Sequence, residues 1–546
     1  MPSRERNLRR ILVASTCLGL AFATGAGCEA APQASAPTTA VVNRDFLTSA
    51  ECARCHSHSP DANALTTASG DDASPHGLWQ ATPMANSFRD PYWRAQMARE
   101  IERAPASRKM VEDLCLRCHA PMAVHAAALA DRAPPSMESL HDDPLARDGV
   151  SCALCHQIQP EELGKAASFS GHATIRGEKR IFGPFENPTV GPMRMNTGYT
   201  PTAAAHISAS ALCGTCHTLY TSTPAGTAFL EQAPYLEWRN SVYSDESGAS
   251  DASRTCQACH MPDQGTMKIA RMPTGFDFNI AIRERVRGHV LVGGNAWLID
   301  LLRLNREELG VVASDASLLR TAAATRSQLA FSTARLSIEG VERQPNGLRF
   351  DLHVQNLAGH KLPSGYPARR AWLEVELRAG RTVLFSSGAT DEAGRFLGVA
   401  DELDIPHYDR IERPNEVAVY EMVALDAQGR PTTSVIDMTS MKKDTRLLPR
   451  GWRADGPHAQ ETAPVGVQGD ADFTDGGDRV NYDIRFSADQ PGPLTLVTWL
   501  RYQPIPPAWV EPLRASRTAE AKDFVRMLDA AKFQPETIAL AIQIID

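Results

Sequence analysis

The stretch Cys52-Ala-Arg-Cys55-His56 is the first of five copies of one pattern, in which two cysteines, two residues apart, precede a histidine. The other copies are Cys115-Leu-Arg-Cys118-His119, Cys152-Ala-Leu-Cys155-His156, Cys213-Gly-Thr-Cys216-His217 and Cys256-Gln-Ala-Cys259-His260. They contain ten of the 12 cysteines and leave only Cys17 and Cys28 outside. Chance would supply roughly 0.01 copies in a chain of this composition. The repetition therefore indicates a chemical requirement.

This pattern is the attachment signature of c-type heme. Two thiols add to the vinyl groups on one edge of the porphyrin, and a helical turn spans that edge. The histidine after the second cysteine then supplies the proximal imidazole of the iron. The sequence predicts five covalently bound heme c groups on the ten cysteines. The predicted proximal ligands are His56, His119, His156, His217 and His260.

Two other uses of these cysteines fit the pattern less well. A structural zinc site takes Cys-x-x-Cys pairs two by two and needs no histidine after each pair. A disulfide framework suits an exported chain, but it does not require histidine after every second cysteine. The odd number of copies and the invariable histidine favour heme over both.

The other face of each iron decides its chemistry. A second protein ligand suits electron transfer, whereas an open position permits substrate binding. The candidate distal ligands are His206, His289, His360, His172 and Met84. His206 precedes the fourth copy closely, His289 follows the fifth, and His360 lies in a Gly/Pro-rich loop. A solvated position is the alternative for His172, and a core position is the alternative for Met84.

Composition and the N-terminus set broader limits. The 546 residues are 43% hydrophobic and 22% charged, as in soluble globular proteins, and suggest two folded units. The net charge of -8 argues against nucleic acid as a partner. A basic start and an apolar run predict an export signal over residues 1–28. If Cys28 is lipidated, the chain is an outer-membrane or cell-surface lipoprotein whose lipid is its only membrane contact; otherwise it is periplasmic.

The rest of the chain divides into segments that differ in composition and in hydrophobic periodicity. Residues 29–44 are predicted to be a flexible linker, and 45–290 the pentaheme domain, with few long periodic elements. Connecting helices are expected over 291–333. Apolar residues then alternate with polar ones, as at Leu348, Phe350 and Leu352, which predicts an antiparallel β-sandwich-like domain over 334–510. Residues 511–546 are expected to form a C-terminal helix and tail.

The predicted fold class is therefore multidomain α plus β. A mainly helix-and-loop multiheme cytochrome c domain precedes the antiparallel β-sandwich-like domain. Within the latter, Asp444 and Arg446 flank Thr445 and are expected in a plain surface loop, with contact to the heme domain as the alternative.

Several segments resemble a known family. Trp79-Gln-Ala-Thr-Pro-Met-Ala-Asn-Ser-Phe-Arg-Asp-Pro-Tyr-Trp and Cys256-Gln-Ala-Cys-His-Met-Pro are two of them. They are similar to multiheme cytochromes of the superfamily that contains the tetraheme cytochrome and hydroxylamine oxidoreductase of ammonia oxidisers. The resemblance covers roughly 45–290. It implies a distal histidine where Met84 stands here, and a Gly-His-Lys-Leu-Pro loop like the one around His360. The family includes carriers and enzymes, so it does not decide the activity.

Three functions remain open, and the third of them is a structural or polymeric conductor in which the sandwich makes subunit contacts. The favoured one is electron relay between other redox proteins through closely spaced hemes. The alternative is a multiheme oxidoreductase that acts on a small nitrogen or sulfur species at one open heme. No catalytic residue is identifiable, and all five copies end in histidine, so the lysine-ligated site of pentaheme nitrite reductases is absent.

Overall fold

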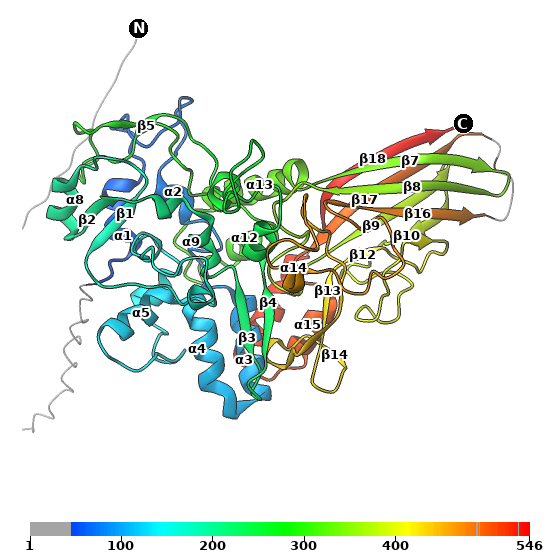
Figure 1. The fold of residues 1–546 in the computed structure, drawn as a ribbon, viewed down its shortest axis with the longest axis horizontal. Helices are drawn as coiled ribbons and strands as arrows, with labels where there is room; N and C mark the ends of the chain where they lie inside the picture. Colours follow the sequence, from blue (N-terminus) through cyan, green and yellow to red (C-terminus); the bar gives the residue numbers. More distant parts are fainter. Residues whose placement is uncertain (1–44, 487–489, 491, 533) are drawn as a thin grey trace, which may run out of the picture. The chain divides into compact units, whose positions relative to one another are not determined.

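A computed structural model describes residues 45–486, 490, 492–532 and 534–546. The predicted export signal over 1–28, the lipidation site Cys28 and the linker 29–44 lie outside these residues. Helices and several sheets follow one another along the described chain, which confirms the mixed α plus β class (Figure 1). None of the helices described is both long and apolar enough to cross a bilayer.

Helical turns carry the five Cys-x-x-Cys-His copies, as the spacing predicts. Three copies lie within α1 (Ser49–His56), α4 (Arg108–His119) and α11 (Cys256–His260), and the third is in α7 (Cys152–Cys155) with His156 directly after it. The fourth begins in α9 (Ser210–Gly214) and continues as a turn, in which the Cys216 and His217 amides donate to the Cys213 carbonyl. Residues three apart share a helix face, so the two thiols of a copy point the same way. Four of these helices have eight residues or fewer. Helices of that length are not stable alone and depend on tertiary packing.

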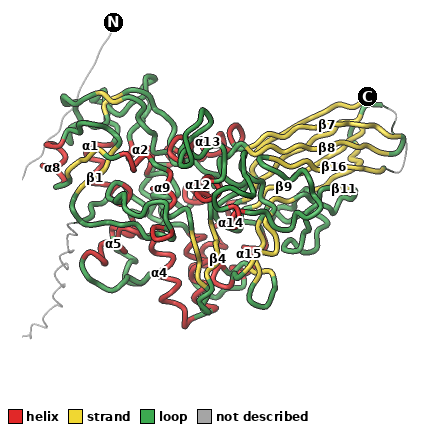
Figure 2. The backbone as a smooth tube through the Cα atoms, in the orientation of Figure 1, coloured by secondary structure: helices red, strands yellow, loops and turns green. Residues whose placement is uncertain are grey.

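The region before the sandwich also contains longer helices than the sequence predicts. Asp90 caps the N-terminus of helix α3 (Pro91–Arg103), because its carboxylate accepts hydrogen bonds from the amides of Tyr92 and Trp93. Loops connect the helices and strands of this region (Figure 2). The remaining helices and strands of the region are α2 (Pro75–Trp79), α5 (Pro121–Leu129), α6 (Pro144–Arg147), α8 (Val190–Thr197), α10 (Pro234–Arg239), β1 (Arg180–Gly183), β2 (Thr200–Ala203), β3 (Leu219–Ser222), β4 (Ala228–Gln232), β5 (Met267–Lys268) and β6 (Ile282–Arg283).

Two predicted helices connect this region to the sandwich. They are α12 (Ala296–Leu304) and α13 (Asp315–Ser332), and the Ser314 hydroxyl caps α13 by accepting from the Ser317 amide, as expected. Helices α14 (Ala459–Thr462), α15 (Pro507–Arg514) and α16 (Ala519–Ala531) come later in the chain. Helix α16 packs against α3 and α12 through Phe524, which is fully buried.

Two facing sheets form the sandwich. One has the order β11 (Arg410–Ile411), β16 (Gly477–Arg485), β8 (Gly347–Asn356) and β7 (Ala334–Gln344). The other has the order β10 (Thr382–Ser387), β9 (Arg370–Ala379), β17 (Leu494–Gln503) and β18 (Glu536–Ile545), with β12 (Val419–Tyr420) also on β9. A small sheet joins β14 (Pro431–Thr432), β13 (Met422–Leu425) and β15 (Ser440–Asp444). The predicted alternation of buried residues holds along β8.

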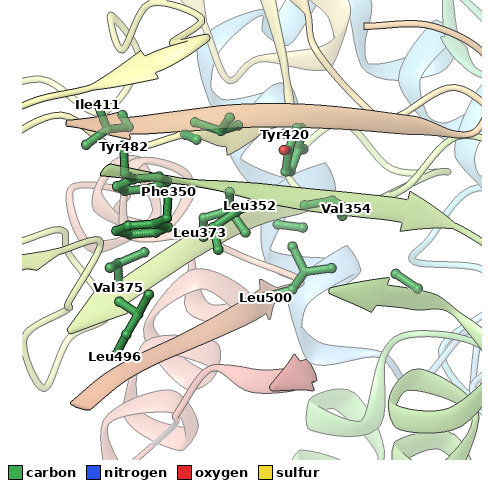
Figure 3. Close-up of a cluster of buried hydrophobic side chains, with 14 of the residues drawn as sticks. Phe350, Leu352, Val354, Leu373, Val375, Ile411, Tyr420, Tyr482, Leu496 and Leu500 are labelled. Carbon is green, nitrogen blue, oxygen red and sulfur yellow. The ribbon is translucent and has the colours of Figure 1, made fainter. Parts of the chain in front are cut away.

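The core of the sandwich lies between the two sheets (Figure 3). Phe350 of β8 stacks on Tyr482 of β16 at a centroid distance of 4.9 Å. Leu373 and Val375 of β9 and Leu496 of β17 meet them from the other sheet, and all are fully buried. This core contains no cysteine, so it does not depend on the heme attachment sites.

The C-terminus differs from the predicted helix and tail. After α16 the chain forms β18, which pairs antiparallel with β17 from Leu494 opposite Ile545 to Tyr502 opposite Glu536. Ile538 is buried in the sandwich core, while Leu540 on the outer face is 52% exposed. Residues two apart normally share a face of a strand, but the register shifts opposite Leu500 and Arg501, where Ile538 is the extra residue, so Ile538 and Leu540 lie on opposite faces.

Candidate heme-binding sites

Four of the five predicted proximal histidines share one hydrogen-bond arrangement. In each of these four the ring Nδ1 donates to a backbone carbonyl, because a carbonyl oxygen can only accept. The pairs are His56 to Ile269 at 2.9 Å, His119 to Ser87 at 2.9 Å, His156 to Phe182 at 2.6 Å and His260 to Val292 at 2.5 Å. Such a bond sets the tautomer and leaves Nε2 with a free lone pair for a metal.

Burial keeps these imidazoles neutral. It lowers the pKa of His119 to about 4 and that of His217 to about 4, and lowers the pKa of His56, His156 and His260 as well. A neutral imidazole is the form that ligates iron. All five predicted proximal ligands are therefore ready to bind a metal at neutral pH.

The ten cysteines are all unpaired, and some from different copies contact one another. Cys52 of the first copy lies within hydrogen-bonding reach of Cys152 of the third. Cys118 of the second copy similarly meets Cys216 of the fourth. Cys213, also of the fourth copy, meets Cys256 of the fifth. The attachment sites therefore form contacting groups rather than isolated ones.

The structure also addresses the zinc alternative. Within the described ranges, the group of three or more ligand-type side chains that lie close enough for a metal ion consists of Asp409, Asp470 and Asp472, far in sequence from the cysteines. No Cys/His set of that kind occurs among those residues.

Two candidate distal histidines face proximal ones at a distance that suits one iron. The ring centres of His156 and His289 are 6.3 Å apart with an interplanar angle of 24°. Those of His260 and His360 are also 6.3 Å apart, with an angle of 12°. Two imidazoles bound to one metal at about 2 Å each have centres about 6 Å apart. The residues present therefore fit a heme iron between each pair.

The hydrogen bonds of the two distal rings agree with this role. His289 donates from Nδ1 to the Arg287 carbonyl at 3.1 Å, and His360 donates from Nδ1 to the Lys361 carbonyl at 2.8 Å. Both bonds leave Nε2 free. Burial, followed by the neighbouring His156, lowers the pKa of His289 to about 4. That ring is neutral, like its proximal partner.

The other three candidates stand in different surroundings. His206 places Nε2 2.9 Å from the Ile158 carbonyl, so only its Nδ1 is available to a metal. His172 is exposed, contacts the Arg117 guanidinium and lines a cavity of about 750 Å³ beside α4. Met84 is half-buried and packs against the core around the second copy. Each of these three stays a prediction.

Sequence reasoning missed Trp93 and gave contact with the heme domain only as the alternative for Asp444 and Arg446. Trp93 of α3 stacks flat on His119, with ring centres 4.1 Å apart. Asp444 and Arg446, expected in a plain surface loop, are instead 1% and 6% exposed and ion-paired beside the His360 loop. Their partners come from distant segments, so no local pattern announces the contact. The sequence signal for their burial was the opposite charges of Asp444 and Arg446 directly before the apolar pair Leu447-Leu448.

Known families and solved structures include proteins similar to this chain. A family model described as cytochrome c554 and c-prime matches residues 51–157, which span the first three copies. No curated protein matches the chain. Among solved structures, a penta-heme cytochrome c552 from Thermochromatium tepidum is similar, with a TM-score of 0.51 and 18% identity over 92% of this chain and 100% of that one. At that identity the likeness concerns the fold.

The repeated attachment motif, the matched family model and the shared fold lead to one coarse conclusion. Residues 51–157 match the cytochrome c554 and c-prime family, and together with the five Cys-x-x-Cys-His copies this match supports a multiheme c-type cytochrome with covalently bound heme c.

Proposed function

We propose that this chain is an exported pentaheme cytochrome c that relays electrons between other redox proteins. Heme c, when bound, supplies a reversible one-electron change at iron. The protein supplies the covalent anchors, the axial ligands and the spacing between attachment sites. The proposal places the chain within the superfamily of the ammonia-oxidiser tetraheme cytochrome and hydroxylamine oxidoreductase, and in the periplasm or, with Cys28 lipidated, on the outer membrane or cell surface.

The observation that carries the proposal is the pairing of His156 with His289 and of His260 with His360. A metal between two imidazoles has no free position for a substrate, so it suits electron transfer. The His289 and His360 rings come from segments outside the Cys-x-x-Cys-His copies. The proposed second ligands of these two copies therefore come from segments distant in sequence.

The contacts between attachment sites support relay along several groups. Cysteines of the first and third copies meet, as do those of the second and fourth, and those of the fourth and fifth. Porphyrins anchored at contacting thiols start from adjacent positions. Electron transfer between redox groups requires such closeness, and every copy takes part in at least one contact.

Two measurements on the purified protein test the proposal. Mass spectrometry should find a heme adduct on each of the five cysteine pairs, and electron paramagnetic resonance (EPR) of the ferric protein should show predominantly low-spin heme. Unmodified cysteine pairs would remove the basis of the proposal. A dominant high-spin signal that changes with added hydroxylamine or nitrite would argue against a pure carrier.

One observation favours the enzyme as a second candidate. The buried carboxyls of Glu231 and Glu100 act electrostatically on the Cys115 thiol of the second copy and on the Tyr366 phenol, whose hydroxyl lies 3.3 Å from that of Tyr92. Burial raises the pKa of Glu231 and of Tyr366. Buried acids and phenols near a heme are suited to proton transfer to a small nitrogen or sulfur species. A high-spin heme assigned to the second copy would support this reading.

A further inference from the structure

Four buried charges form a closed ring next to the His360 loop. The Lys361 ammonium lies 2.6 Å from Asp444, and Arg446 holds the same carboxylate with two bonds of 2.7 Å. Arg446 also reaches Glu237 at 3.2 Å, and Glu237 accepts from the Lys361 amide at 3.1 Å. The side chains are 1% exposed for Lys361, Asp444 and Glu237, and 8% for Arg446.

The ring joins three segments that are distant in sequence. Glu237 belongs to α10, which follows the fourth copy, and the Tyr235 amide of α10 donates to the His217 carbonyl at 3.3 Å. Lys361 lies in the loop after β8, and Asp444 ends β15. Two positive and two negative charges balance. Removing charges from water costs about as much free energy as their pairing returns, so a buried ion-pair ring adds little to stability. It is better suited to setting one geometry.

Lys361 connects the ring to the imidazole of His360. The Lys361 carbonyl accepts the Nδ1 proton of His360, while the Lys361 amide and ammonium are both bonded within the ring. Every polar group of Lys361 is therefore engaged. The Lys361 carbonyl shares its peptide plane with the Leu362 amide, which donates to the carbonyl of Leu447, the residue after Arg446, at 2.9 Å. The preceding peptide plane is held on both sides, because the Lys361 amide donates to Glu237 and the His360 carbonyl accepts from the Asn356 side chain at 2.9 Å.

We propose that Lys361, Asp444, Arg446 and Glu237 are positioning residues that hold His360 opposite His260. This inference rests on the proposed role of His360 as the distal ligand of the fifth copy. None of the four charged side chains is placed as a ligand itself. They act through the Lys361 carbonyl, which sets the direction of the His360 ring and the availability of its Nε2.

The test is Lys361→Met in the full heme-loaded protein, which keeps the length of the side chain and removes its charge. The matched control is Lys443→Met on β15. Lys443 is also buried and also ion-paired, to Glu421 at 2.8 Å, but it is not adjacent to an axial ligand. We expect Lys361→Met to convert up to about one heme in five to high spin by EPR, and added imidazole to restore low spin. Lys443→Met should keep the parental spectrum.

His360→Ala separates this inference from the proposed function. If His360→Ala creates the high-spin signal and Lys361→Met does not, the positioning role is wrong while the ligand assignment stands. If His360→Ala leaves the spectrum unchanged, the ligand assignment fails and the positioning role fails with it. If Lys361→Met does not accumulate with the parental heme content, Glu237→Gln replaces it, because the amide preserves the shape of Glu237 while removing its charge. A parental spectrum for that variant overturns the inference.

Discussion

At the scale of single residues, the pairing of His156 with His289 gives a direct spectroscopic prediction. The 6.3 Å between the ring centres suits two ligands of one iron. His289→Ala removes one ligand without touching the cysteines of the third copy. We expect up to about one fifth of the heme iron to become high-spin, since one copy of five is affected. EPR of the ferric variant, and the return of the low-spin signal with imidazole, measure this.

The control for that experiment is His353→Ala. His353 lies on β8 with its ring 3.4 Å from Glu339 and its side chain 36% exposed. It has no proximal histidine as a neighbour in the described structure, so its removal should leave the spin state unchanged. A high-spin signal of similar size in both variants would show that loss of any histidine disturbs the hemes, and would contradict the assignment of His289.

Asp478 gives a prediction about pH. Burial raises its pKa to about 7, with Asp470 and Asp472 adding to the shift, although its carboxylate accepts a bond from Tyr420 at 2.7 Å. A folded-state pKa above the unfolded value of 3.8 means that the folded state binds the proton more tightly. This carboxyl therefore makes the protein progressively less stable as pH rises from about 4 to about 7.

Asp478→Asn cannot ionise and should remove that penalty. Relative to the parent, we expect its free energy of unfolding to gain about 2–3 kcal/mol between pH 5 and pH 8. Denaturant unfolding of both proteins, followed by the circular dichroism of the sheets, measures the difference at each pH. An equal pH dependence in parent and variant would show that Asp478 ionises in the folded state without cost.

At the scale of elements, the sequence predicted the helices and strands whose formation depends on neighbouring residues. The helix after Ser314 and the alternation at Leu348, Phe350 and Leu352 depend on a cap and on a period, and both occur as expected. The charge ring was not predictable. Lys361 meets Asp444 83 residues away and Glu237 124 residues away, and neither contact leaves a periodic trace. The His260–His360 pair is long-range in the same way.

Strand β18 gives the prediction that belongs to this scale. Along it, Ile538 is 1% exposed and packs in the sandwich core, whereas Leu540, two residues on, is 52% exposed. Ile538→Ala should lower the free energy of unfolding by about 2–4 kcal/mol, because it leaves a cavity. Leu540→Ala should change it by no more than about 0.5 kcal/mol. Equal effects in denaturant unfolding would argue that the segment does not form a strand of the sheet.

At the scale of the whole molecule, the two regions have different sources of order. The sandwich has a continuous core of side chains from β8, β9, β16 and β17. The attachment region relies mainly on short helices, and its proximal histidines are oriented by carbonyls from distant loops, such as that of Ile269 for His56. Helices this short do not persist without partners. Apolar side chains also pack around the second copy, and the proposed covalent hemes would add order by joining loop, helix and histidine at each copy.

This difference predicts what happens without heme attachment. In host cells that lack the cytochrome c maturation system, we expect limited proteolysis to degrade residues 45–290 rapidly, because metal and cofactor binding there is coupled to folding. A fragment that contains the strands from β7 to β18 should survive longer, since its core has no heme site. Mass spectrometry of the protected fragments identifies the boundary, and the heme-loaded protein treated in parallel should resist cleavage in both regions. Equal protection of both regions in the heme-free protein would show that side-chain packing alone folds the attachment region.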